Sequence, residues 1–128
     1  MAKRILVADT PEGDRRISAI LDGHDLVFVR TLGEAQRMLQ REPFGLILIG
    51  VHFDDSRMFD LLRSVQASGR PVVCMRSHQF ASPAITIEGL EIATKTLGCH
   101  LFLDLTWYAD DATGNGALRQ LLEALLSP

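Results

Sequence analysis

The positions at which functional groups are expected lie directly after four short apolar runs of the chain, and most of them carry side chains that could do chemistry. These residues are Asp9 and Thr10, then Gly50, Val51 and His52, then Arg76, Ser77 and His78, and finally Asp104, Leu105 and Thr106. Two histidines and a carboxylate would suit a transition metal, and a serine, a histidine and an aspartate are the groups of a nucleophilic triad. Neither set has the spacing of a known metal motif or of a Gly-x-Ser-x-Gly turn. We therefore expect no catalytic residue, no metal and no cofactor, and keep a metal or small-ligand sensor as the alternative.

Five apolar runs alternate with stretches of helical spacing, and these elements must position the polar residues. The runs are Ile5–Ala8, Leu26–Val29, Leu46–Ile49, Val72–Met75 and Leu101–Leu103. Short unbroken apolar runs are typical of strands buried on both faces of a parallel sheet. The pattern predicts an α/β fold with a doubly wound five-stranded parallel sheet, flavodoxin-like, in the strand order 2-1-3-4-5. On such a sheet the functional groups gather at the carboxyl ends of the strands.

One segment breaks this regular spacing. Residues 77–87 lie between the fourth run and a helix that covers Glu88–Leu97. Ser82 and Pro83 could cap an earlier start of that helix, or the segment is a loop. Both interpretations stay open.

Size and charge exclude several classes of protein. The 128 residues, 47% hydrophobic and 23% charged, predict one domain over residues 1–128. The longest nearly apolar run, Phe44–Phe53, is far shorter than the roughly 18–20 residues of a membrane span. A net charge of −3 without a basic block argues against nucleic-acid binding. Two cysteines and no signal peptide favour a cytoplasmic location.

Several stretches of the chain resemble the receiver domains of bacterial two-component response regulators. They are Lys3–Asp9, Leu21–Val27, Gly33–Ala35, Pro43–Ile49 and Pro71–Val73. The resemblance itself covers essentially the whole chain. The resemblance implies phosphoryl transfer from a phosphohistidine to an aspartate at the end of the third strand. Two further acids would hold Mg²⁺, a lysine would contact the phosphoryl oxygens, and a hydroxyl would sense the product.

The positions of that site are mostly lost in this sequence. Asp9 matches the first acid, but Thr10 replaces the second, and the phosphoacceptor position falls on Gly50. The hydroxyl position falls on Arg76, beside Ser77, and the lysine position on Leu105, or on Asp104 if the register is one residue off.

A charge count relates these losses to one another. Only Asp9 and Arg76 carry formal charge in the altered pocket, so a hard cation would gain little there. We hypothesise that Arg76 pairs with Asp9. His52 also belongs to this degenerate phosphorylation pocket. Asp54 and Asp55 are either substitute phosphoacceptors or caps of the following helix.

A second group of residues predicts an interaction surface. Phe102 matches the aromatic switch residue of receiver domains, and Ile85 and Ile92 would form an extra apolar stripe on the fourth helix. Trp107 and Tyr108 could add aromatic anchors. By the resemblance, we expect a signalling partner or a second copy to bind at the fourth helix, fifth strand and fifth helix.

These observations favour a pseudo-receiver, which is a signalling module without enzymatic activity or aspartyl phosphorylation that acts by protein–protein interaction. Phosphotransfer retained through another acid remains a second alternative.

Overall fold

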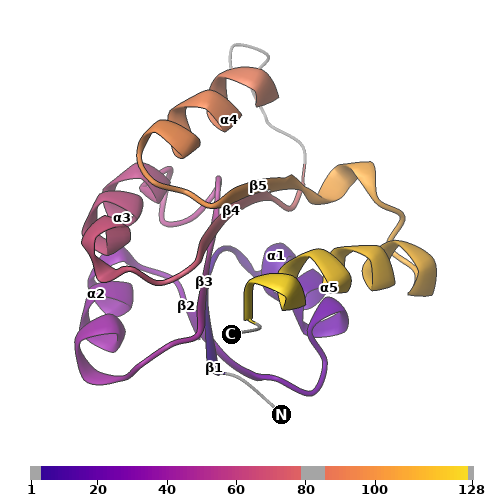
Figure 1. Ribbon diagram of the computed structural model, residues 1–128, viewed down its shortest axis with the longest axis horizontal. Helices are drawn as coiled ribbons and strands as arrows, with labels where there is room; N and C mark the ends of the chain where they lie inside the picture. Colours follow the sequence, from indigo (N-terminus) through magenta and orange to yellow (C-terminus); the bar gives the residue numbers. More distant parts are fainter. Residues whose placement is uncertain (1–3, 79–85, 127–128) are drawn as a thin grey trace.

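A parallel sheet of five strands forms the centre of the molecule (Figure 1). The computed structural model describes residues 4–78 and 86–126. The strands are β1 (Arg4–Ala8), β2 (Asp25–Val29), β3 (Leu46–Gly50), β4 (Val72–Arg76) and β5 (Leu101–Asp104). Their order is β2-β1-β3-β4-β5, so the predicted doubly wound topology is confirmed.

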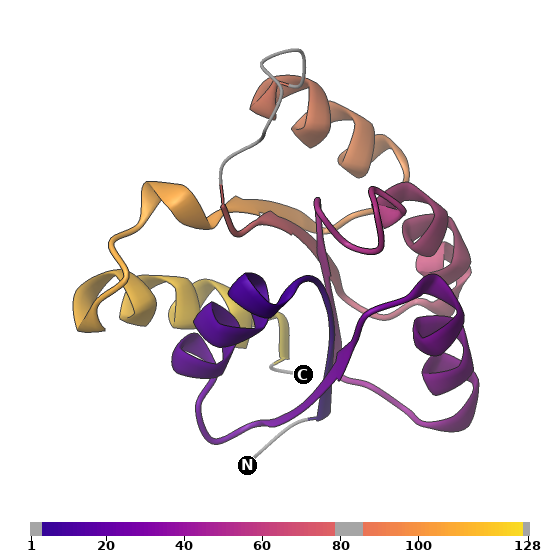
Figure 2. The ribbon, with the colours of Figure 1, turned by 180° about the vertical axis from the view of Figure 1, so that it is seen from behind.

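Helices cover both faces of the sheet. They are α1 (Pro11–Ile20), α2 (Leu32–Arg41), α3 (Met58–Val65), α4 (Ile87–Thr96) and α5 (Ala112–Leu126), with short 3₁₀ turns η1 (Gln66–Ser68) and η2 (Leu105–Trp107). Figures 1 and 2 show α1 and α5 on one face and α2, α3 and α4 on the other. Alternate strand residues therefore enter two cores. Leu6 and Ile47 pack on the α2–α3 side, and Ile5 and Leu48 on the α1–α5 side.

Local signals in the sequence fix where the helices begin. Pro11 is the first residue of α1. Thr31 and Glu34 form a reciprocal capping box at the start of α2. Thr86 caps α4, because its Oγ1 accepts a hydrogen bond of 3.1 Å from the Gly89 amide. The helix thus begins at Ile87, with Ser77 and His78 outside it, and the possible early start at Ser82 and Pro83 lies outside the described residues.

Among residues 4–78 and 86–126, no helix is both long enough and apolar enough to cross a membrane.

Candidate functional site

The carboxylate of Asp9 is the centre of the site at the carboxyl ends of β1, β3 and β4. Asp9 is 1% exposed, and its carboxylate lies against the backbone of two glycines, Gly13 and Gly50. A Cβ atom on Gly50 would lie 2.6 Å from Asp9 Oδ2 and closer still to Oδ1 and Cγ. A Cβ atom on Gly13 would also overlap this carboxylate. Asp9 therefore fills the space that a side chain at position 50 would need.

Burial changes the acidity of Asp9. Loss of hydration raises its pKa from the ordinary value of 3.8 to about 6, and the neighbouring Asp14 acts in the same direction. The Thr10 amide, the Ser77 hydroxyl and His52 oppose the shift because they favour the charged form. Within the described part of the chain, neither Asp9 oxygen makes a hydrogen bond of normal geometry, and the same holds for the buried Thr10 Oγ1. The site thus holds a carboxyl group whose charged form is poorly stabilised.

His52 and His78 lie face to face at the rim of this site. Their ring centroids are 3.9 Å apart and their planes differ by 15°. The His52 Nε2 atom lies 3.3 Å from the His78 carbonyl oxygen, and His78 Nδ1 lies 3.1 Å from Ser77 Oγ. The structure thus brings together the two histidines that the sequence placed at the sheet edge, and the stack joins the β3–α3 loop to the segment that follows β4.

These groups do not fit the divalent cation that the resemblance implies. Mg²⁺ is bound by several oxygen ligands in octahedral geometry. Within residues 4–78 and 86–126, no three histidine, cysteine or acidic side chains are placed to share an ion. Asp14, the acid whose charge acts on Asp9, forms an ion pair with Arg30.

Arg76 pairs with Asp104, so the hypothesis that it pairs with Asp9 is wrong. Arg76 Nε and Nη2 lie 3.1 Å and 2.5 Å from the two Asp104 oxygens, and Nη2 also donates to Thr106 Oγ1 at 3.1 Å. The cause is strand register, because Arg76 on β4 stands directly opposite Asp104 on β5. Burial tends to raise the pKa of Asp104, but the hydrogen bonds from Arg76 and Thr106 outweigh it and lower this pKa.

Leu105, at the predicted lysine position, turns away from the site. It is fully buried in the core between the sheet and helices α1 and α5. An alkyl side chain in that core cannot contact a phosphoryl group. Gly50 and Leu105, at the positions where the resemblance places a nucleophile and a cation, therefore supply neither to the site.

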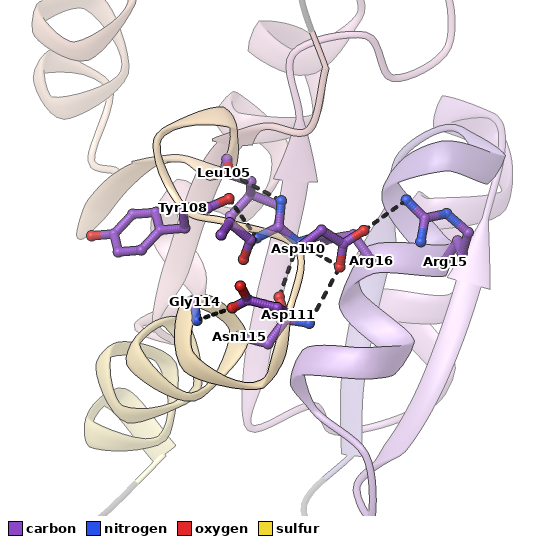
Figure 3. Close-up of polar contacts among 9 residues, drawn as sticks. Arg15, Arg16, Leu105, Tyr108, Asp110, Asp111, Gly114 and Asn115 are labelled. Atoms are coloured by element: carbon purple, nitrogen blue, oxygen red, sulfur yellow. Dashed lines mark hydrogen bonds and ion pairs between the residues drawn. The ribbon is translucent and has the colours of Figure 1, made fainter.

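Sequence reasoning missed Arg16, which organises the loop after β5 (Figure 3). Its guanidinium donates to the carbonyl oxygens of Leu105, Tyr108 and Ala109 at 3.0–3.1 Å and to Asn115 Oδ1 at 3.0 Å. It is 6% exposed. The available signal was helical spacing, because Arg16 is four residues before the buried Ile20 and shares its face of α1. Arg16 thus fixes η2, and with it Trp107, to helix α1.

Asp54 does not cap the helix that follows it, contrary to one of the two expectations. Its Oδ2 accepts a 2.7 Å hydrogen bond from the amide of Leu32, the first residue of α2. Asp54, Asp55 and Ser56 all have positive φ angles, of 43°, 57° and 72°. This left-handed turn directs Asp54 back to the preceding helix.

Phe102 and Trp107, two of the predicted switch and interaction residues, line a groove of about 440 Å³ between α4, β5 and η2. Phe102 is 7% exposed and lines it, together with Ile87, Glu91, Leu103, Asp104, Trp107 and Tyr108. Trp107 is 81% exposed and Ile92, on α4, is 69% exposed. Ile85 lies outside the described residues. Large apolar side chains thus remain uncovered around this groove in the described structure.

No protein-family model matches this sequence, and no curated protein matches it in sequence. Solved structures do match it in fold. The BeF3-activated N-terminal receiver domain of RstA from Klebsiella pneumoniae has a TM-score of 0.73 at 20% identity, over 98% of this chain and 99% of that one. A CheY-like response regulator receiver domain protein from Methanospirillum hungatei JF-1 has a TM-score of 0.67 at 17% identity, over 98% and 94% of the two chains.

A third match is HP1043, described as an orphan response regulator of H. pylori, with a TM-score of 0.70 at 12% identity over 98% and 97% of the two chains. At sequence identities this low, the structural matches establish the fold alone. The chain has the receiver fold of two-component response regulators.

Proposed function

We propose that this protein is a receiver-fold signalling module of a bacterial two-component or phosphorelay system that acts by binding another protein, without aspartyl phosphorylation and without catalysis of its own. The observation that carries the proposal is the packing of Asp9 against Gly50. The phosphoacceptor position has no side chain, and the neighbouring carboxylate fills its space.

The electrostatics of the pocket support the same conclusion. Phosphoryl transfer to a carboxylate needs cations around the transferred group, because negative charge is spread over its oxygens. The Arg76 guanidinium is directed to Asp104 and Thr106. Leu105 supplies no charge, and Asp9 holds a proton more tightly than an ordinary aspartate. The pocket is thus poorly suited to a phosphoryl group.

The groove between α4, β5 and η2 is the binding surface of this proposal. Trp107 lines this groove and Ile92 is exposed on α4, and the core of an interface is enriched in aromatic anchors. Arg16 holds η2 in place through three backbone carbonyls. The surface is therefore preformed, and no phosphorylation is needed to build it. A signalling protein or a second copy of the chain would bind there.

Incubation with acetyl phosphate and Mg²⁺, followed by intact-protein mass spectrometry, tests the proposal. We expect no mass increase of one phosphoryl group. As a matched positive control, the RstA receiver domain is treated in the same way. An acid-stable or acid-labile phosphoryl adduct on this protein would overturn the proposal, and peptide mapping would then show whether Asp54, Asp55 or Asp9 carries it.

A further inference from the structure

The outer edge of strand β2 is open. In the order β2-β1-β3-β4-β5 this strand ends the sheet and pairs with β1 alone, and no other strand of the described structure covers it. An uncovered edge presents unpaired amide and carbonyl groups that can accept a further strand. Phe28, the fourth of the five residues of β2, is 40% exposed. The edge therefore combines unused backbone hydrogen-bonding groups with an uncovered aromatic side chain.

A groove of about 190 Å³ runs beside this edge, between β2 and α2. Its lining consists of Val27, Phe28, Val29, Glu34, Arg37, Met38 and Arg41. Val27 and Met38 are only partly buried against the core, and Ala35 is the single fully buried residue among those described in α2. The groove thus has an apolar floor that α2 leaves accessible.

The free charge along this groove is positive. Arg37 and Arg41 are exposed, and within the described structure neither donates a hydrogen bond or forms an ion pair. The nearby acids are already engaged. Asp25 and Glu42 both pair with Arg4, and Glu34 accepts the backbone amides of Arg30 and Thr31. Glu34 also lines the groove and interacts electrostatically with Arg37, so an occupant meets two guanidinium groups and one carboxylate that already accepts two backbone amides.

We propose that the β2 edge binds an extended acidic segment of a partner protein, which adds to the sheet as a sixth strand. In this binding mode the main-chain hydrogen bonds supply affinity and alternate side chains supply specificity. Successive side chains of a strand point to opposite faces. Every second residue of the segment would be an acid that faces Arg37 and Arg41, and the residues between them would be apolar and pack beside Phe28. This surface is separate from the groove between α4, β5 and η2, so it does not depend on the function proposed above.

The test is a titration monitored by backbone amide NMR. The probe is an acetylated and amidated six-residue peptide of alternating valine and glutamate. The matched controls are a valine–lysine peptide and the valine–glutamate peptide N-methylated at alternate residues, which cannot complete the hydrogen-bond ladder. We expect saturable shifts within Asp25–Val29 and around Arg37 and Arg41 for the first peptide alone.

Charge reversal gives the second arm of the experiment. Arg37→Glu and Arg41→Glu should each weaken binding of the valine–glutamate peptide about fivefold, because an exposed ion pair contributes up to about 1 kcal/mol. The matched control, Arg63→Glu on α3, makes the same charge change away from β2 and should leave binding unchanged. Equal binding of the acidic and basic peptides, equal binding of the N-methylated peptide, or no shift at β2 would overturn the proposal. Shifts confined to the α4–β5–η2 groove would overturn it as well, while supporting the function proposed above.

Discussion

The carboxyl group of Asp9 lies in the volume that a side chain on Gly50 would occupy. A Cβ atom there would meet Oδ2 at 2.6 Å, which is well inside van der Waals contact, and the buried surroundings leave Asp9 little room to move. The two positions are therefore coupled, since any side chain at position 50 requires a different conformation or a smaller residue at position 9. This relationship makes Gly50 a structural requirement of the present core, whether or not the position held a phosphoacceptor in related domains.

Gly50→Ala should destabilise the protein by about 1–3 kcal/mol, the usual cost of overpacking a core. In the background of Asp9→Ala, which removes the overlapping atoms, the same change should cost much less. Urea unfolding of the four proteins gives the coupling free energy, which we expect to exceed about 1 kcal/mol. Additive effects of the two substitutions would show that the two side-chain volumes do not compete.

The raised pKa of Asp9 makes stability depend on pH. The folded protein binds this proton more tightly than the unfolded chain, so the contribution of Asp9 is full below pH 4 and is lost as the pH rises through about 6. A shift from 3.8 to about 6 corresponds to about 3 kcal/mol. Asp9→Asn should remove this slope and should equal or exceed the wild type in stability at pH 7. Unfolding curves recorded between pH 4 and 7 measure how stability changes with pH in the two proteins. Parallel pH profiles would contradict the assignment of this pH dependence to Asp9.

The ion pair between Arg76 and Asp104 should be measurable as a coupling. Both side chains are about one tenth exposed, and removal of one partner leaves the other charge poorly compensated. We expect Arg76→Met to lower the free energy of unfolding by about 3 kcal/mol at pH 7. The same substitution should cost less in a protein that already carries Asp104→Asn. Because the pKa of Asp104 is lowered, this stabilisation is present at neutral pH and disappears as the pH falls below the ordinary range of an aspartate. A double-mutant cycle between Arg76 and Asp9 serves as the control and should show no comparable coupling free energy.

Arg16→Met should release the segment that carries Trp107. The change leaves the carbonyl groups of Leu105, Tyr108 and Ala109 without their donor, which we expect to cost about 3 kcal/mol. Trp107 is the single tryptophan of the sequence, so its fluorescence anisotropy decay reports on η2 alone. A faster, larger-amplitude decay is expected in the variant. Arg15→Met, which removes an exposed ion pair to Asp110 in the same loop but no backbone contact, is the matched control and should change the decay much less.

Substitutions at the groove between α4, β5 and η2 should separate binding from folding. Ile92→Asp and Trp107→Ser alter exposed side chains, and we expect each to change stability by less than about 0.5 kcal/mol. If a second copy binds at this face, both should reduce the mass observed by light scattering at high protein concentration. If the wild type and both variants self-associate equally strongly, the contact between copies lies elsewhere on the protein.

The sheet was predictable because its strands are short apolar runs separated by clear helix signals. Each strand is longer than its run by one residue, and these additions are Arg4, Asp25, Gly50, Arg76 and Asp104, which apolar patterning alone cannot assign. β2 also departs from the pattern of a strand buried on both faces, because it is the edge of the sheet and several of its residues are half-buried or exposed.

The location of the site could be predicted from the sequence, but only some of the contacts within it could. Topology brings Asp9, Gly50, His52 and Ser77 to one sheet edge, as expected. The partner of Arg76 depends on the register between β4 and β5, which is a long-range property that the local sequence does not contain. Arg16 was missed because its charge suggested the surface, although its helical spacing placed it on the buried face.

The most direct test of the central claim is a backbone amide NMR titration with Mg²⁺ and then with beryllium fluoride, which mimics an aspartyl phosphate. The account predicts no saturable shifts around Asp9, Gly50 and Arg76, and no change at Phe102 or in α4. Saturable shifts with beryllium fluoride that start at these residues and spread to Phe102 and α4 would contradict it, because they would show that the domain still switches on phosphorylation.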